Sequence, residues 1–453
     1  MQLDPLVILV IAVAVVFVLI LRLRINAFIA LITAATTVGL LSPNVPLGEV
    51  MPSVAREFGG VCGSIAIVIA LAALIGQCLM ESGAADKIVR VFVRALGEKR
   101  ASLSLLSSGY VLSVPVFFDT VFYLLVPLAR AMRVRMGKNY LLFLMAICAG
   151  GAVTHSMVPP TPGPLAMAAT LKIDLGVMIL VGAVIAVPMS IAGWLFGILR
   201  DRQLDVPLRE TPGLTLEELD ALAKRQEARL PSFFMAMLPI VLPVVLIASN
   251  TLAGAVGAAA GVQAVTGFLG NPNLALLASA AISLAVLARQ KGYTLAQLAK
   301  PVETALASGG LIILITAGGG SFGKMLVQAG VGKTIGDMSQ EFGVPILMLS
   351  FLLGTLLKIA QGSGTVAMIT VSSIMAPLVI DTPPGFHAVY VACAIGSGSL
   401  VGSWMNDSGF WVYKQMSGLT EKEALQTWTP LLAVMGVVGY IVTQIAAILV
   451  PLA

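Results

Sequence analysis

Four ionisable side chains interrupt stretches of the sequence that are otherwise apolar: Asp119, His155, Lys358 and Asp407. A charged group inside such a stretch is costly to bury, so it marks an ion or substrate site by default. Carboxylates and an imidazole can take up and release protons, and an ammonium group can hold the carboxylate of a small ligand. We therefore predict Asp119, His155 and Asp407 as proton-coupling residues and consider Lys358 as an anion-binding residue.

Each of these residues also has a purely structural interpretation. Asp119 and Asp407 could each cap a helix or pair with a hydroxyl, and Asn-Asp-Ser at 406–408 is a common turn sequence. His155 could be a buried histidine whose hydrogen bonds are satisfied. Lys358 could be the salt-bridge partner that holds a hairpin, instead of the cation that meets a ligand carboxylate. The sequence leaves these alternatives open.

Four polar breaks contain these residues and supply further candidate ligands. They cover residues 115–120, 150–164, 358–365 and 396–411, and the second contains four prolines between 159 and 164. Proline cannot continue a helix, and unwound backbone is tolerated in an apolar layer only where protein or a wet cavity satisfies it. Free amides at helix starts bind anions, and hydroxyls suit a polyhydroxylated chain, so we expect a small anionic hydroxy acid as ligand. The predicted substrate-binding residues are Thr120, Thr154, Ser156, Lys358, Gln361, Ser363, Thr365, Asn406 and Ser408.

The composition indicates the surroundings that must position these breaks. Of the 453 residues, 58% are apolar and 11% are charged, and the mean hydropathy is +0.99. Soluble domains carry about 25% charged residues, so this chain cannot cover a soluble surface. Repeated apolar runs of about 20 residues predict an all-α polytopic membrane protein, because barrel strands would alternate in polarity. The net charge of +5 does not indicate nucleic-acid binding, and the four cysteines lack metal-ligand spacing, so we expect no metal and no cofactor.

Most apolar segments fit single membrane crossings, but two are long and broken in the middle. These two, 102–129 and 343–380, are interrupted at 113–115 and at 361–364, and we predict a re-entrant hairpin for each. The first crossing is followed by arginines and lacks a small-residue cleavage site, so we predict an uncleaved span. The predicted crossings are 5–21, 25–41, 61–80, 139–172, 176–199, 232–250, 272–288, 304–320, 386–413 and 429–452.

The positive charges support this layout. With both hairpins re-entrant and the N-terminus outside, most of the 27 Lys and Arg side chains fall in loops that face the cytoplasm. A simple crossing at 102–129 would instead place the basic clusters at 87–100 and 130–138 on opposite faces. We therefore predict that both termini lie outside.

Each half of the chain then holds five crossings and one hairpin, in opposite orientations. We predict a first repeat at 1–199, which includes the broken helix 139–172, and an inverted second repeat at 232–453, which includes the broken helix 386–413. Residues 200–231 are predicted to form a cytoplasmic linker. Inverted repeats with interrupted helices are the usual build of secondary transporters, whose substrate binds near the midplane of the membrane.

At the four breaks the sequence resembles the gluconate permease family of bacterial proton symporters, part of the wider ion-transporter superfamily. The resemblance rests on Pro-Val-Phe-Phe-Asp at 115–119, Thr-His-Ser-Met-Val-Pro-Pro-Thr-Pro-Gly-Pro at 154–164, Ala-Gln-Gly-Ser-Gly-Thr-Val-Ala at 360–367 and Asn-Asp-Ser-Gly-Phe-Trp at 406–411. The strings follow in family order, and the likeness extends from about residue 5 to 450.

The resemblance implies a multi-pass carrier in the bacterial inner membrane that imports gluconate or a related hydroxy acid with protons. It also implies scaffold and transport subdomains, hairpins that meet at the substrate, and a homodimer. Relatives commonly have Glu in place of Asp119, His in place of Thr161, His-Val in place of Trp404-Met405 and Arg in place of Lys358. Other members carry 3-hydroxybutyrate, glycerate, sugar acids or D-serine, so the sequence does not select one acid.

Three other functions fit parts of the pattern. Sodium could replace the proton, held by backbone carbonyls together with Ser363, Thr365 and Asn406. His155 could activate Ser363 or Ser408 in an intramembrane hydrolase, but an inverted repeat has no role in such an enzyme. A channel would need a continuous polar pore, which hairpins entering from both faces would block. The sequence therefore favours a transporter over an enzyme or a channel.

Overall fold

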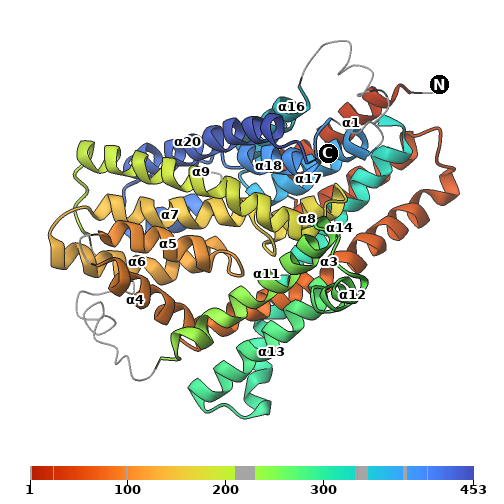
Figure 1. Cartoon of the computed structure of the whole chain (residues 1–453). Coiled ribbons are helices and arrows are strands. Elements are labelled where there is room, and N and C mark those ends of the chain that lie inside the picture. Colours follow the sequence, from red (N-terminus) through yellow and green to blue (C-terminus); the bar gives the residue numbers. More distant parts are fainter. Residues whose placement is uncertain are drawn as a thin grey trace.

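The computed structural model describes residues 3–23, 25–97, 100–209, 230–331, 334, 345–380, 385–405 and 407–452. Throughout these residues the regular secondary structure is helical, as predicted. Seven of the described helices are long and apolar enough to cross a membrane. The chain is therefore an all-α polytopic membrane protein (Figure 1).

The first half of the chain ends in a long helix that follows a broken one. A π-helical turn, Val18–Arg22, extends the first helix, and a 3-10 turn, Leu47–Glu49, leads into the third. The α-helices described here are α1 (Pro5–Phe17), α2 (Ala27–Leu41), α3 (Val50–Glu81), α4 (Ala84–Leu96), α5 (Ala101–Leu112), α6 (Phe118–Met136), α7 (Tyr140–Met157), α8 (Pro162–Thr170) and α9 (Leu175–Gln203).

The second half has a similar order of long and broken helices. The helices described here are α11 (Phe233–Ala255), α12 (Ala260–Leu269), α13 (Pro272–Lys291), α14 (Leu295–Gln328), α16 (Ile346–Gln361), α17 (Gly364–Ile380), α18 (Val389–Gly398), α19 (Ser408–Ser417) and α20 (Glu421–Leu449).

Each segment predicted as a hairpin forms two helices that contact each other, α5 with α6 and α16 with α17. Residues 113–117 separate the first pair and residues 362–363 the second. The two predicted broken helices are interrupted as well, between α7 and α8 at 158–161 and between α18 and α19 at 399–407. Proline and glycine therefore end helices at the places where the sequence indicated breaks.

Several helices differ from the prediction, among them α20, which begins at Glu421, ahead of the crossing predicted at 429–452. The span predicted at 61–80 belongs to α3, which already begins at Val50, and the span predicted at 304–320 belongs to the 34-residue α14. Polar residues near both extensions, such as Arg56 in α3 and Glu303 in α14, lower the hydropathy there without preventing a helix. The short helix α12 was not predicted, because ten residues are too few for an apolar crossing.

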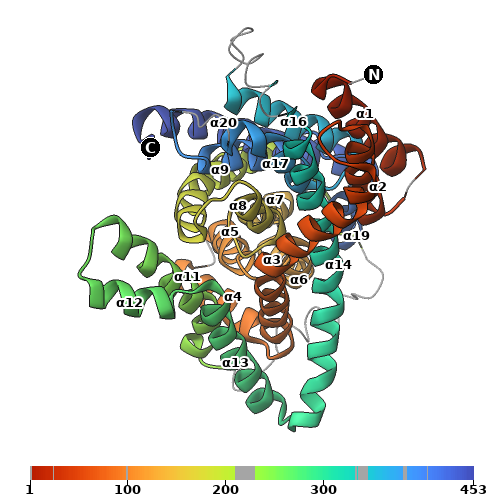
Figure 2. The ribbon, with the colours of Figure 1, turned by 90° about the vertical axis from the view of Figure 1, so that its right-hand side faces the viewer.

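The helices form two groups that cross at an angle. In Figure 1, α5, α7, α9 and α20 lie side by side, whereas α3, α11, α13 and α14 run obliquely past them. In Figure 2, α11 to α13 extend to one side of the molecule, whereas α14 runs along it and packs against α3, α2 and α17. Equivalent contacts occur in the two halves: α3 packs on α13 as α14 packs on α2, and α7 packs on α9 as α18 packs on α20. The inverted relation of the halves stays a prediction.

Glycine allows backbone to approach backbone where α5 meets α7. Every residue of α7 except His155 is buried. A methyl group at Gly150 would lie 2.1 Å from the carbonyl oxygen of Leu106, and one at Gly109 would lie 2.8 Å from that of Ile147. Such small-residue contacts are typical of packed membrane helices, because lipid provides no hydrophobic force between them.

The second half repeats this contact between α16 and α18. A methyl group at Gly398 would lie 2.2 Å from the carbonyl oxygen of Phe351, and one at Gly354 would lie 2.9 Å from that of Ile395. In each half, one glycine on the first hairpin helix and one on the broken helix that follows it therefore allow the two helices to pack backbone against backbone.

We expect Gly150→Ala to destabilise the protein by more than the roughly 1–3 kcal/mol typical of overpacking, because the added methyl meets rigid backbone and not a side chain. The measurement is the midpoint of thermal unfolding of the purified protein in detergent. Gly63→Ala in α3 is the matched control, since nothing lies within 4 Å of its added methyl. Equal midpoints for the two variants would contradict the packing described here.

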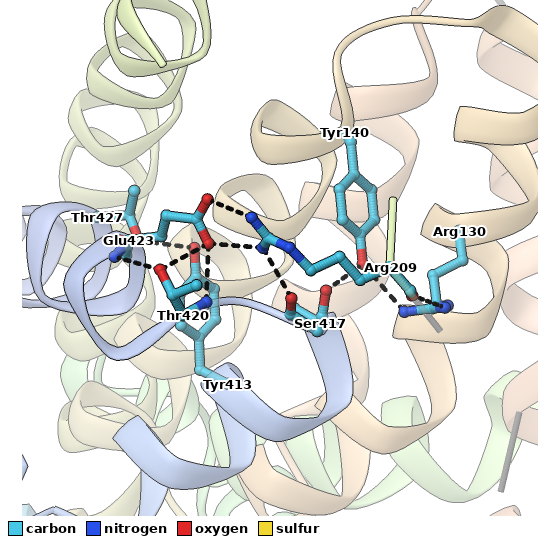
Figure 3. A network of polar contacts seen from close by, with 9 residues as sticks. Arg130, Tyr140, Arg209, Tyr413, Ser417, Thr420, Glu423 and Thr427 are labelled. Atoms are coloured by element: carbon cyan, nitrogen blue, oxygen red, sulfur yellow. Dashed lines mark hydrogen bonds and ion pairs between the residues drawn. The ribbon is translucent and has the colours of Figure 1, made fainter. Parts of the chain in front are cut away.

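A polar network fixes the chain that follows α9 (Figure 3). The Arg209 guanidinium donates to both carboxylate oxygens of Glu423, at 2.7 and 2.8 Å, and to the Gly418 carbonyl at 3.0 Å. The hydrogen bond from Arg209 to Glu423 raises the pKa of the Arg209 guanidinium. Arg130, which is buried, donates to the Arg209 carbonyl oxygen at 2.5 Å. Tyr140 beside it donates to the Ser417 carbonyl at 2.8 Å.

The first part of the predicted linker is thus bound to the helices on which it lies. Residues 204–209 connect α9 to side chains of α6 and α20 and to the turn between α19 and α20. Val206 within this segment is buried. The rest of the linker, at 210–229, lies outside the described residues.

Candidate functional site

The four polar breaks surround one cavity of about 300 Å³. Its walls come from the starts or ends of helices in both halves, together with α14 and α20. Two isoleucines of α14, Ile312 and Ile315, form an apolar part of the wall. The predicted site residues that line the cavity are Asp119, His155, Ser156, Lys358, Ser363, Thr365, Asp407 and Ser408.

Helix N-termini converge on this cavity. Phe118 of α6, Pro162 of α8, Gly364 of α17 and Ser408 of α19 all line it, and each is the first residue of its helix. The N-terminal end of a helix carries a partial positive charge and unpaired amide groups. Four such ends around one small space create a setting that favours an anion.

An ion pair lies at one side of the cavity. The Nζ of Lys358, in the last turn of α16, is 2.8 Å from Oδ2 of Asp407, which caps α19. The two side chains are only 5% and 11% exposed. Lys358 also donates to the carbonyl oxygen of Gly362, which ends α16 in the left-handed conformation at φ 86°. The pair therefore ties the second hairpin to the loop between α18 and α19.

Further hydrogen bonds hold the Asp407 carboxylate. The Gly409 amide donates to Oδ1 at 3.0 Å, and the Ser403 hydroxyl donates to Oδ2. The indole Nε1 of Trp428, in α20, donates to the Ser403 oxygen at 2.7 Å. Because an indole N–H can only donate, the Ser403 oxygen must accept from Trp428, and its own hydrogen remains for Asp407. Asp407 is thus both a helix cap and an ion-pair partner.

Asp119 and His155 face the same cavity with fewer partners. Asp119 lies in the first turn of α6 and forms no ion pair within the described part of the chain. The ring of His155 is packed edge-on against Phe117, with centroids 6.2 Å apart, and its Nδ1 is buried without a hydrogen-bond partner. Neither group is therefore held in an ion pair by the described residues around the cavity.

Hydroxyl groups complete the polar lining. In the described residues, the hydroxyls of Ser156, Thr365 and Ser408 have no hydrogen-bond partner in the protein. The Ser363 oxygen accepts from the Val366 amide at 3.3 Å, so it caps α17, but its hydrogen is not used there. Neither Ser363 nor Ser408 is hydrogen-bonded to His155 among the described residues.

Two of the predicted substrate-binding residues do not line the cavity. Thr154 is fully buried in α7 with its hydroxyl unpartnered, and Thr120 lies beyond the lining residues of α6. Each is adjacent in sequence to a residue that does line the cavity, and successive residues of a helix point about 100° apart. The structure thus brings His155 and Asp119 to the cavity, whereas Thr154 and Thr120 are not among its lining residues. Asn406 and the side chain of Gln361 lie outside what the structure describes.

Other residues of the site were not predicted. Ser403 and Trp428 hold Asp407, and Ser399 lines the cavity beside them. Serine is common in apolar helices, and Trp428 begins an apolar crossing where an aromatic residue is unremarkable. Only their positions in the structure show that Ser403, Trp428 and Ser399 belong to the site. The described residues contain no group of three His, Cys, Asp or Glu side chains that could hold a metal ion.

We expect Lys358→Met to destabilise the protein by about 3 kcal/mol, because it leaves the buried Asp407 carboxylate without its cation. Asp407→Asn should also destabilise it, and the double variant should lose clearly less than the sum. Thermal unfolding of the purified proteins gives the four midpoints of this cycle. Strictly additive losses would show that the pair contributes nothing.

Lys414→Met is the control for this cycle. Lys414 is 3.5 Å from Glu421, but the two side chains are 26% and 54% exposed. Exposed pairs contribute about 0–1 kcal/mol, so this variant should unfold close to the wild-type temperature.

Comparisons with known proteins agree with one another. The model for the GntP family permease matches residues 4–449. A gluconate permease of Pseudomonas aeruginosa is 34% identical over 422 residues, 92% of this chain and 92% of that protein. The low-affinity gluconate transporter of Escherichia coli is 32% identical over 426 residues, 93% of this chain and 94% of that protein.

A solved structure resembles the whole fold. The crystal structure of the YdaH transporter from Alcanivorax borkumensis matches with a TM-score of 0.65, covering 94% of this chain and 98% of that one. The two sequences are 12% identical, so the likeness is one of fold.

Proposed function

The chain belongs to the GntP permease family, and on that premise we propose that it is a proton-coupled symporter of gluconate or a related small hydroxylated monocarboxylate. The names of its relatives in Pseudomonas aeruginosa and Escherichia coli support gluconate itself. A cavity of about 300 Å³ is at the small end of ligand sites, which suits an acid of this size.

The observation that carries this proposal is the balance of charge around the cavity. Two carboxylates, Asp119 and Asp407, face one ammonium, Lys358. With His155 neutral, these groups have a surplus of one negative charge before any ligand enters. A bound carboxylate would add a second negative charge in a small space with little water, where like charges repel strongly. A proton that enters with the anion cancels this addition, so the site suits coupled uptake.

The lining also suits the rest of a hydroxy acid. The hydroxyls of Ser156, Thr365 and Ser408 can donate to or accept from the hydroxyls of a substrate. The N-termini of α6, α8, α17 and α19 attract its carboxylate. Ile312 and Ile315 of α14 offer no polar partner to a substrate. On this proposal, the substrate and the helix ends that bind it separate from α14 most easily.

We also propose that residues 1–199 and 232–453 are inverted repeats joined by a linker at 200–231. The matched glycine contacts of Gly150 and Gly398, and the matched packing of α3 on α13 and α14 on α2, support a duplication. On this proposal the protein lies in the inner membrane with both termini outside, and it works as a homodimer in which one group of helices carries the substrate past the other. Binding would drive this motion only through its different affinity for the two states.

The test is uptake of labelled gluconate into proteoliposomes whose interior is alkaline. If one proton accompanies each anion, a gradient of one pH unit should give about tenfold accumulation, which a proton ionophore should abolish. Unlabelled glycerate, 3-hydroxybutyrate and D-serine, added as competitors, rank the substrates.

The same vesicles separate the alternatives. Uptake that requires a sodium gradient and ignores the pH gradient would favour a sodium-coupled carrier. Failure to transport gluconate or any competitor supplied in labelled form would overturn the proposed substrate class. Hydrolysis of a supplied ester without uptake would favour the intramembrane hydrolase.

A further inference from the structure

We infer that Asp407 and the substrate carboxylate bind Lys358 alternately. When the substrate binds, Asp407 takes up a proton and, as a neutral acid, releases Lys358. This inference rests on the proposed function and assigns its coupling proton to one carboxylate. It also makes Ser403 and Trp428 positioning residues that hold Asp407 in both of its protonation states.

Lys358 is where an anion should bind. It is the only Lys or Arg among the described residues that line the cavity. It also lies beside the start of α17, because a methyl group on Gly364 would be 3.9 Å from its Nζ. An ammonium group next to a helix N-terminus combines a full charge with free amides, and a carboxylate can use both.

Lys358 is not free in the structure, however. Its ammonium is already bonded to Asp407 at 2.8 Å and to the Gly362 carbonyl. A substrate carboxylate that approached Lys358 would therefore bring a second carboxylate to a cation that is already neutralised. Two carboxylates that share one buried site cannot both remain ionised without a large cost, so a proton on one of them is favoured.

Asp407 can accept that proton with little loss of hydrogen bonding. Its Oδ1 can still accept from the Gly409 amide. Its protonated Oδ2 becomes a donor, and the Ser403 oxygen has a second lone pair beyond the one used by Trp428. The Ser403 hydroxyl would then turn its hydrogen elsewhere and accept from Asp407. Neutral Asp407 loses only its bond to Lys358, and the substrate carboxylate replaces that bond.

The surroundings of Asp407 limit which other groups could accept the coupling proton. The titratable groups that face the cavity with it are Lys358 from α16, Asp119 from α6 and His155 from α7. The neighbouring residues from α17, from the loop after α18 and from α20 are Thr365, Ser399 and Trp428, which do not titrate. Asp119 and His155 have no ion-pair partner among the described residues, so protonating either would not release Lys358.

The exchange accounts for coupling in both directions. A proton from the outer solution binds Oδ2 of Asp407 as the substrate carboxylate binds Lys358, and the same proton leaves when the substrate departs and the ion pair forms again. In the empty and in the loaded protein, one carboxylate balances Lys358. Substrate without proton leaves two carboxylates on one ammonium, and proton without substrate leaves a buried ammonium unpaired. Both half-loaded states are therefore disfavoured.

The experiment is calorimetric titration of the purified protein in detergent with gluconate between pH 5 and 9. In the wild type, the affinity for gluconate should fall with rising pH wherever Asp407 of the unliganded protein is ionised. Because binding then takes up one proton, the fall should reach up to tenfold per pH unit. In Asp407→Asn, affinity should stay constant with pH and be at least as high as the wild type reaches in acid. In Lys358→Gln, affinity should drop at least tenfold at every pH.

Ser403→Ala keeps the test valid if Asp407→Asn fails to fold. The ion pair is left intact, but the hydrogen bond from Ser403 to the ionised carboxylate is charge-assisted and therefore stronger than the one Ser403 accepts from the neutral acid. Its loss costs the ionised form more, so the pH at which affinity falls should move upward. An unmoved profile in Ser403→Ala would overturn the inference. So would a wild-type pH dependence in Asp407→Asn, or a loss of binding in that variant as complete as in Lys358→Gln.

Asp119→Asn is the matched control, since it removes the other carboxylate of the cavity and leaves the pair in place. Its affinity should still fall with pH. If the fall disappears in Asp119→Asn and persists in Asp407→Asn, the coupling proton belongs to Asp119 and the inference is wrong, while the proposed function stands. A wild type that binds neither gluconate nor the competing acids would overturn the proposed function, and the inference with it.

Discussion

The polar interior of this protein depends on the ion pair between Lys358 and Asp407, which joins two places where helices stop inside an apolar protein. Charges so well enclosed are stable only when they are paired and hydrogen-bonded, and Gly362, Ser403 and Gly409 supply the additional bonds. The pair thereby fixes the second hairpin relative to the loop between α18 and α19. The pair lies beside the cavity, whose other walls come from the helix ends of both halves.

Much of the fold could be predicted from the sequence, because the cost of unwound backbone in an apolar layer is high and leaves a clear mark. The prolines between 159 and 164 and the glycines of 362–364 indicated breaks, and helices end at both places. The lengths of α3 and α14 could not be predicted from hydropathy, since their ends carry polar residues that a helix accepts. The short helix α12 is apolar, but its ten residues are too few for a membrane crossing, so hydropathy did not predict it.

The candidate site was predicted in outline for a similar reason. Asp119, His155, Lys358 and Asp407 attract notice because charges are rare in apolar segments, and all four line the cavity. Their hydroxyl neighbours were harder to assign, because one residue along a helix decides which side chain faces the cavity, as Thr154 and His155 show. The pairing of Lys358 with Asp407 joins residues 49 positions apart, and no spacing rule predicts it.

The glycine contacts between α5 and α7 have a mechanical consequence. Where backbone touches backbone, no side chain lies between the helices that could change its rotamer and let one slide along the other. The same holds for α16 and α18. Each hairpin and the broken helix beside it are therefore packed as one rigid unit. At the cavity, by contrast, α14 contributes the aliphatic side chains of Ile312 and Ile315. Farther along the same helix, Gly323 again meets backbone, at Ser373 of α17.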